Sequence, residues 1–549
     1  MSSPFSGKQI NFIYMNGAIK KIAQKAYRRI WDSYLEVRLY AKFYKTTPRK
    51  GGDKGNILIY AGIGYMYLAP IEILLYHLLS KKGYEVDYLI YDESVEINEL
   101  ITAEVIEKQG KDKFWNKSVH RARKVLSAAG VSYSFITKRP EVEDILSNGD
   151  FSSLEQILAF KHEGVDFGNI VEGVMYRYYK SKNFGKDAPE VAHKFLTTAL
   201  TNYYQIKYLA ATKRYEYVLF SHGIYCTWEP VVQYCQSSNL NFISYDRAKT
   251  KGHCNFNLNQ PSPVWDFSAA WSRLKDKSLT QAELRRVNDY LEDRILQRND
   301  VYAYNFSEKE KDISVLKQRL GIAPHAKVIT LFTNLIWDAA NVSRDIAFSS
   351  PLDCILQTIQ KYTDRADVHI LIRTHPAEKV LGTKERYSAL IKDHFNNELP
   401  RNVTIIEPED SINSFSVIDI TTIGVTHTST VGLELAIDDK PSILISETHY
   451  RDKGFTYDVN SSREYFDLLE NLLLSPSSKP RQVELAKKYF YIMMFEYQHL
   501  MPMAFDERGV FKGYSYPDFQ QLLEDEDAPI QQIVNRITAG TPVTDFIFR

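Results

Sequence analysis

The sequence is poor in the patterns that mark several common protein classes. Its 549 residues include only four cysteines, none of which forms a Cys-x-x-Cys pair or has the spacing of a zinc site. We therefore expect reduced thiols in a cytoplasmic protein. No run of 18 apolar residues occurs, and the first 21 residues lack a continuous apolar core. The sequence thus predicts neither a transmembrane helix nor a signal peptide.

An excess of charge of one sign is also missing. The chain has 68 basic and 68 acidic side chains, a net charge of zero, so it lacks the overall basic charge of a nucleic-acid-binding protein. No Asp-x-Asp pair stands where a divalent metal would be needed, and we expect no metal and no other cofactor. The apolar content of 44% is ordinary for a globular protein, and the length suits two large domains with extensions.

The second half of the chain carries the clearest pattern. A short apolar strand, His369 to Ile372, stops at the polar segment Arg373 to Pro376. A second unit has the order strand, polar loop, helix and strand: Ile420 to Val425, Thr426 to Thr430, Val431 to Ile437, and Pro441 to Ile445. This order is typical of a parallel sheet, in which ligands bind at the carboxyl ends of the strands.

The start of the helix at Val431 has the chemistry of a phosphate site. Ser429 or Thr430 would cap this helix, and Gly432 would let a ligand approach the backbone closely. Free N–H groups and the helix dipole favour an anion, while Glu434 would accept hydrogen bonds from a ribose diol. A Ser or Thr before a helix is more often only a cap that holds no ligand, which is the alternative for Ser429 and Thr430.

A neighbouring strand end adds two donors to this edge. Arg373 and His375 follow the strand His369 to Ile372 and would donate hydrogen bonds to a phosphate. Either residue alone is weak evidence, but both strand ends in this order predict a nucleotide site.

Four motifs resemble one known family. They are RTHPAE (Arg373 to Glu378), THTSTVGLELA (Thr426 to Ala436), DKPSILI (Asp439 to Ile445) and HYRDKGFTYD (His449 to Asp458). Together they resemble the capsule polysaccharide biosynthesis glycosyltransferases of the GT-B fold, including bacterial Kdo transferases and, more distantly, bacterial sialyltransferases with a His-Pro motif and a later Ser/Thr pair. The resemblance is good over residues 327–458, weaker over 56–271, and does not cover the first 50 or last 60 residues.

The resemblance implies an α/β protein in which two Rossmann-like domains face a central cleft. The second domain would hold the nucleotide-sugar donor, with the His-Pro histidine and the Ser/Thr pair on its phosphate and ribose. Together with the residue chemistry, it predicts a donor site made of Asn334, Arg373, His375, Pro376, Thr428, Ser429, Thr430, Gly432, Glu434, Arg451 and Lys453. Arg451 and Lys453 lie in a loop that either closes over the donor or is merely solvated.

The first half opens with a strand, Asn56 to Ala61, followed by Gly62 and Gly64. The third glycine of a dinucleotide fingerprint is missing, so we infer no NAD site. Residues 95–215 are expected to be mainly helical. Further strands, Tyr217 to Phe220 and Asn241 to Tyr245, are followed by His222 and Asp246.

His222 and Asp246 are the candidates for a catalytic base, since both would line the acceptor side of a cleft. A helix cap at His222 and a salt bridge from Asp246 to Arg247 are the alternatives.

Residues 1–54 form a basic extension with 12 Lys and Arg against 3 Asp and Glu. Ala18 to Tyr44 reads as an amphipathic helix flanked by basic residues. Such a helix can lie on an anionic membrane surface, pack against the protein body, or form a dimer contact.

We expect five segments: a basic helical extension (1–54), an N-terminal acceptor domain (55–275), a helical connection (276–320), a donor domain (321–480) and C-terminal helices partly crossing back (481–549). The predicted function is metal-independent transfer of a sugar from a nucleotide-sugar donor, such as CMP-Kdo or a related acid sugar, to a surface polysaccharide or lipid-linked glycan. The predicted location is the cytoplasm or the inner membrane face. The alternatives are a nucleotide-sugar epimerase, a polyol phosphate transferase, and a non-catalytic partner in glycan assembly.

Overall fold

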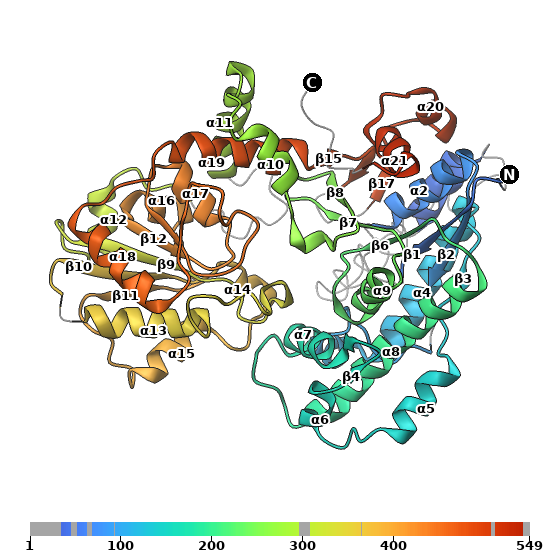
Figure 1. Ribbon diagram of the computed structural model, residues 1–549, viewed down its shortest axis with the longest axis horizontal. Coiled ribbons are helices and arrows are strands. Elements are labelled where there is room, and N and C mark those ends of the chain that lie inside the picture. Colours follow the sequence, from blue (N-terminus) through green and yellow to red (C-terminus); the bar gives the residue numbers. More distant parts are fainter. Residues whose placement is uncertain are drawn as a thin grey trace, which may run out of the picture.

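Two α/β lobes lie side by side in the computed structural model, each built on its own sheet (Figure 1). The structure describes residues 34–45, 52–62, 68–92, 94–295, 308–363, 365–506 and 511–541. The predicted fold class, α/β with two sheets that each have a parallel core, is confirmed. The division at residues 54, 275, 320 and 480 stays a prediction.

The first lobe contains a seven-stranded sheet in the order β15-β8-β7-β6-β1-β2-β3. Its parallel core comprises β1 (Asn56–Tyr60), β2 (Glu85–Ile90), β3 (Ser134–Phe135), β6 (Tyr217–Ser221) and β7 (Phe242–Arg247). β8 (His253–Leu258) pairs antiparallel with β7, and β15 (His499–Leu500) pairs antiparallel with β8. The central strands are almost wholly apolar and buried because helices cover both faces of the sheet.

The region between β2 and β6 is mainly helical, as predicted. Its helices are α3 (Ala103–Gln109), α4 (Lys111–Ala129), α5 (Pro140–Asn148), α6 (Leu154–Leu158), α7 (Phe167–Tyr179) and α8 (Ala188–Thr212). A small hairpin, β4 (Lys161–His162) and β5 (Val165–Asp166), interrupts them. Two further helices flank the sheet, α2 (Ala69–Lys81) and α9 (Tyr225–Ser237).

The sequence pattern did not predict β8, which begins at His253. The strand is hard to recognise because it carries two buried asparagines. Asn255 accepts a hydrogen bond from the Asp246 backbone N–H at 3.1 Å, and Asn257 accepts one from the Tyr497 hydroxyl at 2.7 Å. Polar residues therefore occupy positions where a sequence pattern would expect apolar ones.

The second lobe contains a six-stranded, wholly parallel sheet in the order β11-β10-β9-β12-β13-β14. Its strands are β9 (Lys327–Phe332), β10 (Val368–Arg373), β11 (Val403–Ile406), β12 (Ile423–Thr426), β13 (Ser442–Leu444) and β14 (Tyr457–Asp458). The helices around it include α13 (Pro351–Tyr362), α14 (Ala377–Leu381), α15 (Tyr387–His394), α17 (Val431–Ile437) and α18 (Ser462–Leu474). The strand predicted from Ile420 begins only at Ile423.

Ile420 instead ends α16 (Ser414–Ile420), whose first turn is capped by Asn413. The Asn413 side chain accepts a hydrogen bond from the Phe415 N–H at 2.9 Å. A short apolar run is ambiguous between helix and strand, and here the cap favours the helix.

The chain passes twice between the lobes on one side of the molecule (Figure 1). α10 (Ser268–Leu274) leads out of the first lobe, and α19 (Gln482–Tyr491), continued by the π-helical turn Ile492–Glu496, leads back to it. After β15 come the hairpin β16 (Met503–Phe505) and β17 (Phe511–Tyr514), then α20 (Phe519–Glu524) and α21 (Pro529–Ala539). These last elements pack on the first lobe, where α21 contacts α2.

The described part of the N-terminal extension packs against this C-terminal segment. Residues 34–43 are helical. Tyr40 stacks on Phe511 with ring centroids 4.9 Å apart, and Phe43 stacks on Tyr514 at 4.1 Å. The rest of the predicted helix from Ala18 lies outside the described residues.

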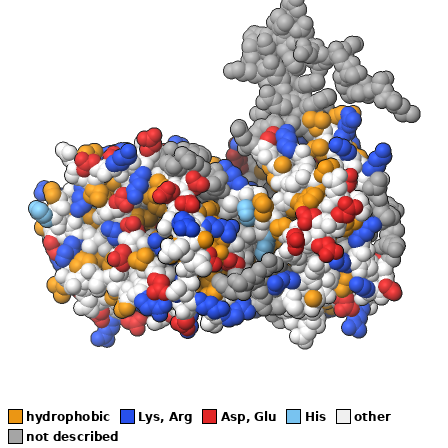
Figure 2. Space-filling view, turned by 90° about the horizontal axis from the view of Figure 1, so that it is seen from above, with side chains coloured by type: hydrophobic (Ala, Val, Ile, Leu, Met, Phe, Trp, Pro, Cys, Tyr) orange, Lys and Arg blue, Asp and Glu red, His pale blue; other side chains and the backbone are white. Residues whose placement is uncertain are grey.

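Charge is mixed on the one face seen from above (Figure 2). Figure 2 shows acidic and basic side chains interspersed over the face seen from above, in keeping with the net charge of zero. Among the described residues, no helix is long and apolar enough to cross a membrane.

Candidate functional site

Loops that follow strands of both sheets meet between the lobes. In the loop after β9, the Arg344 guanidinium donates a hydrogen bond to the Pro263 carbonyl of the first lobe at 3.3 Å. In the loop after β13, the His449 ring lies 5.0 Å from the ring of Trp265. Lys249, in the loop after β7, lies 5.0 Å over the same Trp265 ring. The edge where parallel sheets bind ligands is therefore shared by both lobes.

His222 and Asp246 lie at this edge in the first lobe and touch each other. Nε2 of His222 is 3.2 Å from Oδ2 of Asp246. The other ring nitrogen, Nδ1, contacts the hydroxyl of Ser221, which is buried. Both imidazole nitrogens thus face groups of the protein. The side chains of His222 and Asp246 are 12% and 18% exposed, so only a small part of the pair reaches the surface.

The turn that carries His222 is strained. His222 has a φ of 56°, Gly223 of 82° and Tyr225 of 69°, so two non-glycine residues adopt left-handed backbone conformations. Such conformations persist where surrounding structure enforces them, often at functional sites. The His222 ring stacks on Trp228 with centroids 5.5 Å apart. Burial lowers the pKa of His222 from its ordinary value, although the Asp246 carboxylate acts in the opposite direction.

In the second lobe, the loop between β12 and α17 is held from three sides. The Ser429 hydroxyl accepts a hydrogen bond from the N–H of Val431, the first residue of α17, at 3.3 Å, while Thr430 holds the N-cap position of this helix and makes no side-chain cap bond. The Thr428 hydroxyl contacts the side-chain amides of Asn334 and Asn341 in the loop after β9. The Tyr450 hydroxyl donates to the Ser429 carbonyl at 2.5 Å. Asn334, Thr428 and Ser429 are therefore brought together as expected.

Gly432 has a different role from the one expected. A Cβ at this position would lie 2.5 Å from the Tyr450 hydroxyl and 2.7 Å from Oγ1 of Thr426. Protein atoms, rather than a ligand, occupy the space that this glycine leaves open. Gly432 is needed for packing between α17 and the loop after β13.

His375 is held as a neutral hydrogen-bond donor. Its backbone N–H donates to Oγ1 of Thr333 at 3.1 Å, and its Nδ1 accepts from the Ala377 N–H at 3.1 Å. The ring proton therefore lies on Nε2. Burial, helped by the charges of Arg373 and Lys249, lowers the pKa of His375 to about 4. Pro376 stands next to it as the residue before α14.

Three other expected ligands are engaged inside the second lobe. The buried Arg373 guanidinium donates to the carbonyls of Glu407 and Ile412 at 3.3 and 3.1 Å. The buried Arg451 guanidinium donates to the carbonyls of Ser446 and Val459, each at 3.1 Å.

Glu434 is likewise buried and forms an ion pair of 2.6 Å with Arg294 of α11 (Gln281–Ile295). The same Arg294 donates to the hydroxyl of Thr430 at 3.4 Å. Arg373, Arg451 and Glu434 thus stabilise the loops around the site, and the structure does not bring them to an open surface beside His375 and Ser429.

Sequence reasoning missed a group of cations around His449. Burial, then the positive charges of Lys249, Arg344 and Lys453, hold the pKa of His449 well below its ordinary value. Only Lys453 among these was expected at the site. Lys249 follows Asp246 by three residues in a strand-end loop, so the rule that selected Asp246 would also have found it.

A second missed residue is His427, within the motif that suggested the donor loop. Its Nε2 lies 2.8 Å from Oδ1 of Asp345. The Ser446 hydroxyl donates to the His427 carbonyl at 2.7 Å. These contacts tie the loop that carries Arg344 to the end of β12.

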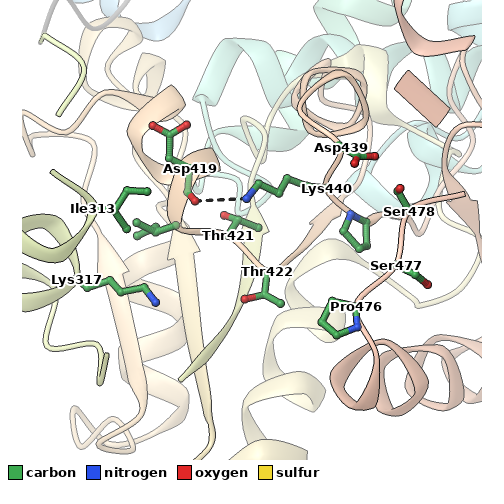
Figure 3. Close-up of a pocket in the computed structure, with 12 residues that line it drawn as sticks. Ile313, Lys317, Asp419, Thr421, Thr422, Asp439, Lys440, Pro476, Ser477 and Ser478 are labelled. Carbon is green, nitrogen blue, oxygen red and sulfur yellow. Dashed lines mark hydrogen bonds between the residues drawn. The ribbon is translucent and has the colours of Figure 1, made fainter. Parts of the chain in front are cut away.

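A cavity of about 570 Å³ lies at the opposite edge of the second sheet. Its lining includes Thr422 and Pro441, which precede β12 and β13 (Figure 3). Its lysines, Lys317 and Lys440, donate to the backbone carbonyls of Pro324 and Asp419. This cavity is therefore separate from the candidate site. Among the described residues, no group of three or more His, Cys, Asp or Glu side chains is arranged to hold a metal ion.

Comparison with known proteins supports the family resemblance. Residues 269–467 match the family model described as capsule polysaccharide biosynthesis protein, so the resemblance is confirmed over this stretch. No curated protein sequence matches the chain.

Solved structures with a similar fold include two KpsC proteins of Thermosulfurimonas dismutans. The beta Kdo 2,4 transferase is 12% identical with a TM-score of 0.34, covering 59% of this chain and 87% of that one. The beta Kdo 2,7 transferase is 13% identical with a TM-score of 0.33, covering 56% and 85%. The UDP-GlcNAc 2-epimerase of Neisseria meningitidis is 10% identical with a TM-score of 0.24, covering 78% and 94%. At these values, the likenesses carry no conclusion about chemistry.

Proposed function

We propose that this chain, which matches the capsule polysaccharide biosynthesis family over residues 269–467, is a glycosyltransferase of surface polysaccharide synthesis. It moves a sugar from a nucleotide-sugar donor to a glycan or lipid-linked acceptor. The observation that carries the proposal is the meeting of two sets of groups between the lobes. One is the His222–Asp246 pair, and the other is the set of donors and cations around His375, Ser429 and His449.

The second-lobe groups suit the diphosphate or monophosphate of a nucleotide sugar. His375 offers a neutral N–H donor, and the loop from Thr428 to Thr430 offers hydroxyls and backbone N–H groups. Lys249 and Arg344 place positive charge near His449. Fixed donors and cations stabilise charge that develops on a leaving phosphate, so this transfer needs no bound metal. The donors that fit are CMP-linked acid sugars such as CMP-Kdo, and UDP or GDP sugars.

The first-lobe pair suits deprotonation of an acceptor hydroxyl. Both imidazole nitrogens of His222 face protein groups, and the two oxygens of Asp246 contact His222 and the Arg247 N–H. Because each carboxylate oxygen keeps a further lone pair, Asp246 is the better base, and His222 orients it. A base must come within hydrogen-bond reach of the proton that it removes. Asp246 stands near the end of β7, three residues before Lys249, with a side chain that is 18% exposed, which supports this role.

The test has two stages. A thermal-shift panel of CMP, CDP, UMP, UDP and GDP should identify one nucleotide class, since a ligand at about 100 times its dissociation constant adds roughly 2.7 kcal/mol of stability. The corresponding nucleotide sugars are then incubated with and without a glycan acceptor. Release of nucleotide that depends on acceptor is the expected result. Conversion of the sugar without acceptor would indicate an epimerase, and no binding or turnover with any donor would indicate a non-catalytic protein.

A further inference from the structure

Besides the crossing helices α10 and α19 and the contacts around Pro263 and Trp265, the lobes also meet where residues 180–183 contact Lys384 and Glu385. The carboxylate of Glu385, in the second lobe, accepts three hydrogen bonds from the turn after α7 in the first lobe. Oε2 accepts from the Ser181 hydroxyl at 2.9 Å and from the Lys182 backbone N–H at 2.7 Å. Oε1 accepts from the Asn183 side-chain amide at 2.6 Å. One side chain thus accounts for three polar contacts between the lobes.

The backbone on both sides reinforces this contact. The Lys384 N–H donates to the Lys180 carbonyl at 3.0 Å. Lys180 has a left-handed φ of 54°, which ends α7 and turns residues 181–183 toward the second lobe. The Lys180 ammonium forms an ion pair of 2.8 Å with Glu104. The turn is therefore shaped and held before it meets Glu385.

The position of the contact relates it to the candidate site. Glu385 follows α14, the helix that begins directly after His375 and Pro376. In Figure 1, α14 points from the second lobe toward α7, while α10 and α19 join the lobes at the top of the view. A cavity of about 510 Å³ lies beside the contact and is lined by residues of both lobes, among them Tyr179 and Leu390. The lobes are thus joined covalently on one side, and on another by these polar bonds together with packing of Ala339 of the second lobe against Gly173 of α7.

We propose that Glu385 and the turn formed by residues 181–183 act as a latch that holds the two lobes closed. The contacts are solvent-exposed or half-buried polar bonds, which are individually weak. Such bonds break and re-form more easily than a large apolar interface would. When the latch opens, the lobes separate about the crossing helices, and the loop that carries His375 moves away from α7. The latch fixes the separation between the donor loops and the His222–Asp246 pair.

Hydrogen exchange of the intact chain tests the latch without any substrate. The Lys182 amide donates to Glu385 itself and loses its acceptor in Glu385→Ala, whereas the Lys384 amide donates to the Lys180 carbonyl and keeps its acceptor. Faster exchange of the Lys384 peptide in Glu385→Ala therefore reports separation of the lobes, and we expect it to be about tenfold, which corresponds to ~1.4 kcal/mol. The matched control is Glu470→Ala, because Glu470 accepts a bond from Arg365 within the second lobe only. That variant should exchange at the parent rate in both peptides.

Two further measurements keep the result decisive. Glu385→Gln retains an acceptor oxygen and should give an intermediate effect, and small-angle scattering should show a larger radius of gyration for Glu385→Ala than for the parent. A melting temperature close to that of Glu470→Ala shows that the variant is folded. Parent-like exchange and scattering in a folded Glu385→Ala would overturn the latch. This outcome is independent of whether the chain transfers sugars, since no readout uses activity.

Discussion

The hydroxyl of Tyr450 occupies the space in which a side chain at Gly432 would lie, 2.5 Å from the position of a Cβ. The same hydroxyl donates to the Ser429 carbonyl, so one buried tyrosine both requires the glycine and supports the loop between β12 and α17. Packing, not ligand approach, explains the glycine in the THTSTVGLELA motif.

Replacement of Gly432 by alanine should therefore destabilise the fold. Overpacking of this kind costs about 1–3 kcal/mol, and loss of the hydroxyl in Tyr450→Phe costs about 1 kcal/mol. In the double variant the nearest clashing atom is gone, so the combined loss should be smaller than the sum of the two. Chemical denaturation of the two single variants and of the double variant measures each loss in the free energy of unfolding. Losses that add to within about 0.5 kcal/mol would contradict the relationship.

His375→Ala should weaken binding of the donor nucleotide while the fold survives. A hydrogen bond to a charged phosphate contributes about 1.5–3 kcal/mol, which predicts a loss of roughly 10- to 100-fold. Calorimetric titration with the nucleotide found in the thermal-shift panel measures the loss. His394→Ala is the control, because His394 is the last residue of α15 and contacts Gln360 of α13 rather than a residue of the candidate site. Unchanged affinity in a folded His375→Ala would remove this residue from the site.

Asp246→Asn should lower turnover by about 100-fold or more, since it removes the base, and should leave nucleotide binding intact. His222→Ala should have a smaller effect on turnover, because the carboxylate remains. Asp92→Asn is a matched control: Asp92 follows β2 of the same sheet and bonds to Ser94 in its own turn. Steady-state rates for the three variants decide between these roles. Parent rates in both Asp246→Asn and His222→Ala would place the base elsewhere.

Glu378 predicts a dependence of stability on pH. Burial raises its pKa from 4.5 to about 8. The folded protein therefore holds a proton that the unfolded chain has released, and stability falls as the pH rises from about 4.5 through about 8. Glu72 and Glu229, with pKa values raised to about 7, act in the same direction.

Glu378→Gln isolates the contribution of this one carboxyl group. Its stability should fall less steeply with pH than that of the parent, as measured by denaturant unfolding at a series of pH values. Parallel curves for parent and variant would show that Glu378 titrates normally.

The basic N-terminal segment predicts binding to anionic membranes. Deletion of residues 1–30 should reduce co-sedimentation with anionic vesicles, and added salt should weaken binding of the intact chain. The deletion must stop before Tyr40 and Phe43, because their packing on Phe511 and Tyr514 stabilises the first lobe. Equal binding to neutral and anionic vesicles would indicate instead that the whole extension packs against the protein body.

Sequence reasoning succeeded where a signal was local and apolar. α17 was predicted with the bounds that the structure has, and the strands predicted from Asn56 and from Tyr217 match β1 and β6 to within one residue. These elements have uniform apolar patterns bounded by polar loops. β8 was missed because Asn255 and Asn257 are buried through partners that are distant in the chain. No local pattern reports such partners.

In the candidate site, too, positions along the chain could be predicted from the sequence, whereas side-chain contacts could not. The rule that ligands bind at the carboxyl ends of parallel strands selected His222 and Asp246 at the ends of β6 and β7 in the first sheet, and His375 after β10 in the second. This rule did not reveal that the Arg373 side chain turns to carbonyls of the loop after β11. It also did not reveal that Glu434 pairs with Arg294, which lies 140 residues earlier in the chain. Side-chain direction depends on such tertiary partners, and residue type alone does not fix it.

β15 has a consequence for how the chain reaches its final form. This strand joins the first sheet by pairing with β8, although it follows the whole second lobe in sequence. The first sheet thus remains incomplete, with the edge of β8 at His253 and Cys254 unpaired, until residue 500 has been synthesised. During translation the second lobe is made entirely before the first lobe can close. The nascent chain therefore exposes an unpaired strand edge, which is a site of aggregation, and truncation before β15 would leave that edge exposed permanently.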